Sequence, residues 1–73
     1  MTYYEAAMAV GYEVAGVRSE LIVKGYGRSR RMAKKDGHRK AMSQIKRLVA
    51  PDRYRVLYSF PVSFLETPVE EDF

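Results

Sequence analysis

The chain has 73 residues, no cysteine, a 47% share of hydrophobic residues and a formal net charge of +4. A chain of this length forms one small domain that buries only about 60% of its unfolded surface, so its stability is marginal. The absence of cysteine excludes a disulfide framework and a thiolate metal site. No apolar run approaches the roughly 18–20 residues that span a bilayer, and the start MTYYEAAMAV lacks a signal-peptide pattern. We expect a soluble, cytoplasmic protein.

The positive charge is concentrated in the middle of the sequence. Residues 1–20 carry three acids and one base, residues 21–50 carry ten bases and one acid, and residues 51–73 carry two bases and five acids. Such a basic block costs self-repulsion in the folded state and is typical of a protein with an anionic partner. The pattern therefore favours a polyanion-binding role over simple solubility.

Residues 2–10 are compatible with two structures. Thr2 and Glu5 fit a capping box, the alanines around Met8 favour a helix, and Gly11 could end it. The side chains at even positions from residue 4 to residue 14 instead alternate like one face of a strand. We favour a short N-terminal helix.

Two strands and one long helix follow. Residues 12–17 (YEVAGV) and 20–26 (ELIVKGY) are predicted strands of a hairpin with its turn near Arg18 and Ser19. Ser29 and Asp36 are candidate caps of the next helix, and Pro51 stops it. The predicted apolar stripe of this helix contains His38, Ala41, Met42, Ile45, Leu48 and Val49. Gly37 weakens the helix by about 1 kcal/mol relative to alanine, which indicates a kink or a close contact.

The last predicted element is a third strand at residues 53–60 (RYRVLYSF). The alternation places Tyr54, Val56, Tyr58 and Phe60 on one face, which we expect to be core. Pro61 ends this strand or places it at a sheet edge, and residues 62–65 extend it after a bulge. Residues 66–73 form an acidic, mobile tail. The predicted fold is one α+β domain at residues 1–65, with a small antiparallel sheet of about three strands packed by one long amphipathic helix.

The segment GYGRSRRMAK, residues 25–34, is the candidate phosphate site. A strand leads through a glycine-bearing loop into a helix start, where backbone N–H groups and the helix dipole favour an anion and glycine permits close approach. The Gly-Lys-Ser/Thr ending of a Walker loop and the third glycine of a dinucleotide fingerprint are absent. The alternative is a glycine turn before a solvated basic helix. The predicted phosphate contacts are Arg28, Arg30, Arg31, Lys34 and Lys35, with a wider footprint from Arg39, Lys40, Lys46 and Arg47 and with Tyr26 as a candidate for base stacking.

The run GRSRRMAKKDGHRKAM resembles the C-terminal third of the double-stranded RNA-binding domain. In that family a strand and a glycine-containing loop precede a Ser-Lys-Lys-x-Ala-Lys motif and an alanine-rich helix. Ser29 to Lys34 stand where that motif would be, and the Gly-Tyr-Gly and Lys-Ala-Met patterns are similar to those of a small-subunit ribosomal protein with a related domain. The resemblance implies that Arg30, Arg31 and Lys34 hold phosphates on both sides of an RNA major groove, with recognition mostly of A-form shape.

A second hypothesis belongs to another class of function. The end of the chain, Glu70-Glu71-Asp72-Phe73, resembles the acidic tips with which bacterial and phage single-strand-binding proteins dock on partner enzymes. The chain could therefore be a small modulator, of the kind viruses encode, that binds a larger enzyme through this tail or through a sheet edge. A homodimer that shares a sheet edge is compatible with both hypotheses.

An enzyme is not expected. There is no Ser/His/Asp set, no cysteine nucleophile and no clustered carboxylates, so no cofactor is predicted. His38 is the only histidine, which makes no metal site. Because it falls on the predicted apolar stripe, we expect it to be a partly buried packing residue.

Overall fold

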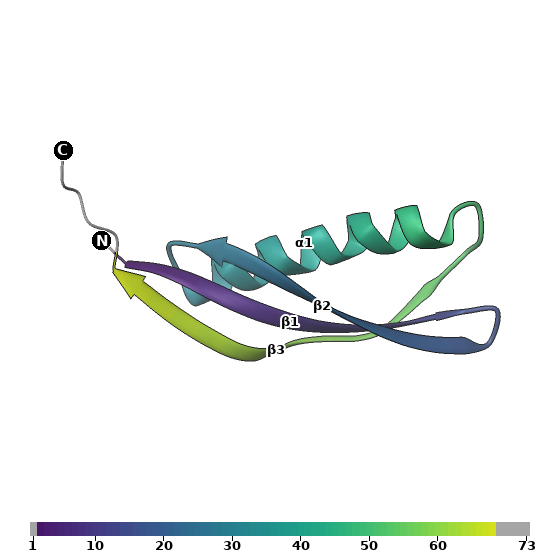
Figure 1. The fold of residues 1–73 in the computed structure, drawn as a ribbon, viewed down its shortest axis with the longest axis horizontal. Coiled ribbons are helices and arrows are strands. Elements are labelled where there is room, and N and C mark those ends of the chain that lie inside the picture. The colour runs from purple at the N-terminus through teal and green to yellow at the C-terminus, as the bar shows by residue number, and fades with distance from the viewer. Residues whose placement is uncertain (1, 69–73) are drawn as a thin grey trace.

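The computed structural model describes residues 2–68, which form a three-stranded antiparallel sheet with one helix packed on one face (Figure 1). The elements follow the chain in the order β1 (Thr2–Val14), β2 (Val17–Gly27), α1 (Arg30–Val49) and β3 (Arg55–Pro68). β1 is the central strand, between β2 and β3. The predicted α+β class, with three strands and one long helix, is confirmed. Nowhere in residues 2–68 is a helix long and apolar enough to cross a membrane.

The N-terminal segment is strand β1, so the predicted N-terminal helix is wrong. Ala6, Met8 and Val10 are buried beneath α1, and the Met8 side chain lies against Gly37 of the helix. These are the even positions of the alternating pattern. Alanine prefers a helix by only a few tenths of a kcal/mol per residue over most other residues. Pairing on both sides and burial of one whole face outweigh that preference.

A two-residue turn at Ala15 and Gly16 joins β1 to β2, which corrects the turn predicted near Arg18 and Ser19. Val14 pairs directly with Val17. Ala15 has a φ of 50° and Gly16 a φ of 81°, as the type I′ turns of tight hairpins require. The turn was hard to locate because alanine rarely adopts a positive φ.

The helix α1 begins where the sequence predicts. The Ser29 hydroxyl accepts a hydrogen bond from the N–H of Met32 at 3.1 Å, which satisfies one of the unpaired donors of the first turn. The other candidate cap, Asp36, lies inside the helix.

The face of α1 that packs on the sheet is made mainly of small residues. It contains Ala33, Gly37, Ala41 and Ile45, at intervals of four. Gly37 lies against Gly25 of β2. A methyl group added to Gly25 would overlap backbone atoms of both Gly37 and Ala33. The close contact, one of the two roles expected for Gly37, is therefore confirmed.

The apolar stripe predicted from His38 to Val49 is only partly correct. Ala41 and Ile45 are buried, but His38 is exposed and Leu48 is 68% exposed. Contacts at every fourth residue follow a ridge that is inclined to the helix axis. The row of contacting residues therefore turns gradually around the helix. It includes Ala33 and Gly37 and does not include Leu48.

Strand β3 pairs with β1 through two irregularities of register. One lies opposite Ala7 and Met8, where Val62 has no partner, and this is the bulge predicted after Pro61. The other lies between Val56 and Tyr58, where Leu57 is the extra residue. An extra residue in one strand turns the following side chains to the other face of the sheet.

The second bulge corrects the predicted core face of this strand. Tyr54 and Val56 pack against the core. Tyr58 lies instead over Gly11 on the face away from α1, and Phe60 pairs with Ala9 on that same face. These two rings are 39% and 48% exposed, so their predicted place in the core is wrong.

β3 extends through residues 66–68, which were predicted to belong to the tail. Glu66 pairs with Tyr4, and the next two residues pair with Tyr3 and Thr2. These pairings exist because β1 begins at residue 2 as a strand, and a helix there would have left β3 without a partner at this end.

The hydrophobic core contains few large side chains. Of the buried hydrophobic residues, four are alanines, and the largest fully buried side chains are Ile45 and Val10. Small residues let α1 lie close to the sheet, but they bury little apolar area per residue. The fold therefore has a thin core, as expected for a domain of this size.

Candidate nucleic-acid interface

The N-terminal turn of α1 is basic, contrary to what helix stability favours. Arg30 and Arg31 occupy this turn, and it contains no acidic residue. Cations near a helix N-terminus oppose the helix dipole, at a cost of roughly 0.3–1 kcal/mol each at exposed sites. A bound anion at this end of the helix would remove that unfavourable interaction.

An open groove runs between α1 and β3 on the helix-bearing side of the sheet. Met8, Lys34, Lys35, His38 and Ser59 line it, and its volume is about 330 Å³. The Nδ1 atom of His38 lies 2.8 Å from the Ser59 hydroxyl, in a hydrogen bond that joins the helix to β3. We call this feature the α1–β3 groove. Two lysines and a histidine of α1 therefore line it, opposite Ser59 of β3.

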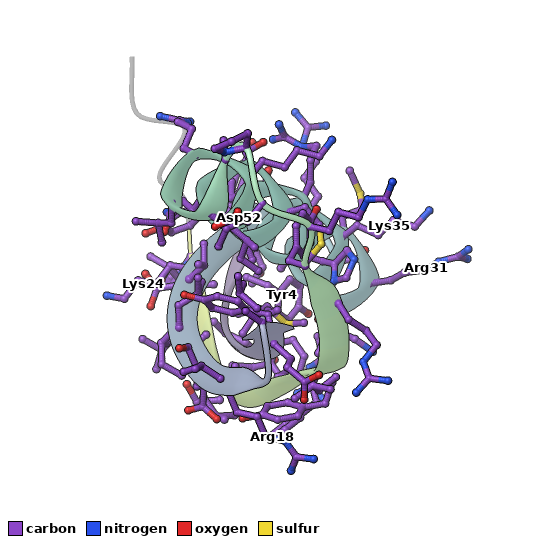
Figure 2. All side chains as sticks on the ribbon, turned by 90° about the vertical axis from the view of Figure 1, so that its right-hand side faces the viewer. Tyr4, Arg18, Lys24, Arg31, Lys35 and Asp52 are labelled. Atoms are coloured by element: carbon purple, nitrogen blue, oxygen red, sulfur yellow. The ribbon has the colours of Figure 1, made fainter. Side chains whose placement is uncertain are left out.

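Arg31 and Lys35 project to the same side of the molecule, sideways from α1 (Figure 2). Lys24 of β2 points to the opposite side, and Arg18 lies on the side of the sheet opposite the helix (Figure 2). Six of the predicted phosphate contacts have no acidic side chain within ion-pair distance among residues 2–68: Arg28, Arg31, Lys34, Lys35, Lys46 and Arg47. Arg31 and Arg47 are separated by roughly 24 Å along the helix.

Arg30 interacts with the end of β3. Its guanidinium lies 5.4 Å from the centre of the Phe64 ring and 3.6 Å from the Glu66 carboxylate. Both Arg30 and Glu66 are more than half exposed, so this ion pair contributes little to stability. Glu66 therefore competes with any anion for Arg30.

Asp36 forms ion pairs with two of the predicted contacts. Its carboxylate lies 2.8 Å from both Lys40 and Arg39, and it accepts a hydrogen bond of 2.9 Å from the backbone N–H of Tyr26. The bonds from Lys40 and Tyr26, and then Arg39, lower the pKa of Asp36 from 3.8 to about 2. Asp36 thereby ties α1 to edge strand β2, and its single charge compensates one of the two positive charges of Lys40 and Arg39.

Tyr26 lies on the β2 side, away from the α1–β3 groove. The Lys40 ammonium lies 4.9 Å from the centre of its ring, which is a cation–π distance. The predicted stacking candidate instead lines a second open hollow of about 330 Å³, which shares only Lys35 with the α1–β3 groove. The structure brings in three residues that sequence reasoning missed, Ser59, Phe64 and Glu66. Only the pairing of β3 with β1 places them beside the helix, and no local sequence signal encodes that pairing.

The face of the sheet away from α1 is close to neutral. Glu5 pairs with Lys24, and Glu13 pairs with both Arg18 and Arg55. The Tyr58 hydroxyl donates to Glu20, and this hydrogen bond raises the pKa of Tyr58. The strand register places three acids and three bases on this face, so it offers no excess of positive charge to a polyanion.

The predicted tail contacts Glu70, Glu71, Asp72 and Phe73 lie outside the described residues. Among residues 2–68 there is no group of three or more potential metal ligands. No protein family, curated protein or solved structure matches the chain.

Proposed function

We propose that this protein is a non-enzymatic nucleic-acid-binding module whose contact surface is the α1–β3 groove and the N-terminal turn of α1. The observation that carries the proposal is the set of cations there without acidic partners in residues 2–68, Arg31, Lys34 and Lys35. A protein of marginal stability gains nothing by keeping such charges together. A polyphosphate backbone would compensate them.

The proposed contacts would fix the position of a duplex without reading its sequence. Lysine and arginine bind phosphate oxygens, and phosphate contacts carry no direct base information. Ser59 and His38 add hydrogen-bonding groups of the kind that also contact phosphate and sugar. The more distant Lys46 and Arg47 would meet a second stretch of backbone along the helix.

RNA is proposed over DNA because of the local likeness to the double-stranded RNA-binding domain. A strand, a serine cap and a basic first helical turn follow one another here as they do in that family. The element order β1, β2, α1, β3 differs from the family, in which the chain usually ends with the helix. The proposal therefore transfers the basic helix start alone and no other contact of the family.

A salt-dependent titration tests this function. Labelled duplex RNA, duplex DNA of the same sequence and a single strand are titrated with protein at several salt concentrations. With four to six phosphate contacts, the logarithm of affinity on duplex DNA should fall with the logarithm of salt concentration at a slope of about −4 to −5. Tighter binding to duplex RNA would support an A-form preference, and the lack of binding to any nucleic acid at physiological salt would contradict the proposal.

A further inference from the structure

The face of the sheet away from α1, which we call the outer face, carries large apolar side chains that no element of residues 2–68 covers. Ile22 of β2 is 54% exposed, and Leu65 of β3 is 57% exposed. Together with Tyr58 and Phe60 they flank the central strand. Exposed apolar groups gathered on one face of a monomer mark an interaction surface, unlike scattered single residues.

The register makes this surface continuous. Ala9 pairs with Ile22 on one side and with Phe60 on the other, so the three residues form a row across the sheet. Ala9 is only 2% exposed although no element covers it, and it is not part of the core under α1. The side chains of Ile22 and Phe60 therefore shield Ala9 from solvent. They form an apolar ridge on each side of the central strand, where the side chain of Ala9 is short.

The charges of the outer face decide what can cover it. Lys24, Arg18 and Arg55 are each paired with glutamate on this face, so the face is balanced while the helix side is strongly basic. A nucleic acid has no electrostatic reason to bind here. A second copy of the chain can approach with this face without the repulsion that two basic helix sides would cause.

The sheet edges are less suited to a second copy. On the β2 edge, the N–H of Tyr26 is already bonded to Asp36 of α1. The β3 edge contains Pro61 and Pro68, which lack backbone N–H donors, and it also contains both bulges. Prolines and bulges protect edge strands from pairing with another chain.

We propose that the outer face is a homodimer interface, in which two copies pack sheet against sheet about a two-fold axis. A two-fold contact uses the same patch on both copies, so Phe60 and Ile22 of each chain lie at its centre. Stacked sheets lie about 10 Å apart, with each α1 on the outside. The two basic sides are then separated by more than the Debye length of about 8–10 Å. The dimer also adds apolar burial to a thin core.

Sedimentation equilibrium over a range of protein concentrations tests the proposal. The wild-type chain should sediment with twice the monomer mass of 8.4 kDa. Phe60→Glu should raise the dimer dissociation constant roughly 100-fold, because it places a charge at the centre of the contact. Leu48→Glu is the control, since Leu48 is an apolar residue on α1 that is even more exposed than Phe60, at 68% against 48%, and it should leave the dimer intact.

A second variant separates this interface from an edge contact and guards against misfolding of the first. Ile22→Thr keeps a β-branched residue in β2 and should weaken the dimer roughly tenfold. An effect of Phe60→Glu without any effect of Ile22→Thr would overturn the proposal in favour of pairing through the β3 edge. A monomeric wild-type chain would also overturn it and would leave a different protein as the occupant of the outer face.

Discussion

The two sides of the sheet differ in what they bury and in how their charges are paired. The α1 side buries the core and accumulates uncompensated cations, whereas the outer face pairs its charges and leaves apolar side chains exposed. The contrast also appears in the packing. A methyl group added to Gly25, on the α1 side, would overlap backbone atoms of the helix. A methyl group added to Gly11, on the outer face, would overlap the Tyr58 side chain. Stability and the proposed phosphate contact therefore depend on one side, and the proposed self-association on the other.

The largest expected effect comes from adding a methyl group to Gly25, and the same change at Gly11 is the control. Gly25→Ala should lower the free energy of unfolding by about 3 kcal/mol or more, because the methyl overlaps helix backbone that cannot move without separating α1 from the sheet. Gly11→Ala should change it by less than about 1 kcal/mol, since the Tyr58 ring can rotate away and glycine is itself unfavourable in a strand.

Urea denaturation followed by circular dichroism measures both changes. Because a domain of this size has a total stability of only about 4–11 kcal/mol, Gly25→Ala should move the midpoint far below that of the wild-type chain. Similar losses in the two variants would contradict the view that the α1 side alone carries the tight packing.

The helix side could be predicted from the sequence more completely than the sheet. The Ser29 cap, the stop before Pro51 and the basic helix start are local signals, and all three are present in the structure. The strand order is not local. β1 becomes central only through pairing with β3, about fifty residues away, and the alternation in residues 2–14 shows a buried face without showing what covers it.

The outer face is where the prediction from the local sequence pattern is wrong. The alternation in residues 53–60 predicts one face for Tyr54, Val56, Tyr58 and Phe60, and the extra residue Leu57 divides them between two faces. A bulge has no strong sequence signal here, because Leu57 is an ordinary strand residue. The basic residues of the candidate site could be predicted from the sequence. Their neighbours Ser59, Phe64 and Glu66 could not, because only the pairing of β3 with β1 places them beside the helix.

Removal of charge from each side sharpens the comparison in binding. The triple variant Arg31→Ala, Lys34→Ala, Lys35→Ala should weaken binding to duplex nucleic acid roughly 100-fold, because three charge-assisted contacts are lost. It should also reduce the magnitude of the salt slope on duplex DNA by about 2.7.

The control is a triple variant with the same change in net charge, Arg18→Ala, Lys24→Ala, Arg55→Ala. These three cations lie on the outer face and are paired with glutamates, so their loss should cost far less affinity. Equal losses for the two triple variants in the same titration would mean that only net charge matters and that the α1–β3 groove is not the contact surface.

Asp36→Asn tests the link between helix and edge strand. The carboxylate is held by Lys40, Tyr26 and Arg39, so we expect a loss of about 1–2 kcal/mol at neutral pH. The folded pKa of about 2 lies below the ordinary value of 3.8. Asp36 therefore stabilises the fold above about pH 4, and this contribution is lost as the pH falls towards 2.

Unfolding curves between pH 7 and pH 2 should show wild type and Asp36→Asn converging as the solution becomes acidic. Asp52→Asn is the matched control, because it removes the same charge from the exposed segment between α1 and β3 and should leave the pH profile of stability close to that of wild type. A constant difference in stability between wild type and Asp36→Asn at all pH values would contradict this prediction. It would mean that the loss comes from packing and that the charge of the carboxylate does not stabilise the fold.

The smallest expected change touches neither side of the sheet. Ala15 holds a φ of 50° in the hairpin turn, and asparagine adopts this conformation more readily than alanine, so Ala15→Asn creates the preferred Asn-Gly pair with Gly16. The free energy of unfolding should rise by about 0.5–1 kcal/mol, seen as an increase of a few degrees in the melting temperature. Affinity for nucleic acid and the mass in sedimentation should not change, because the turn lies outside both surfaces. If Ala15→Asn altered either of them, the hairpin end would have to be counted as part of that surface, and the division of roles between the two sides of the sheet would no longer hold there.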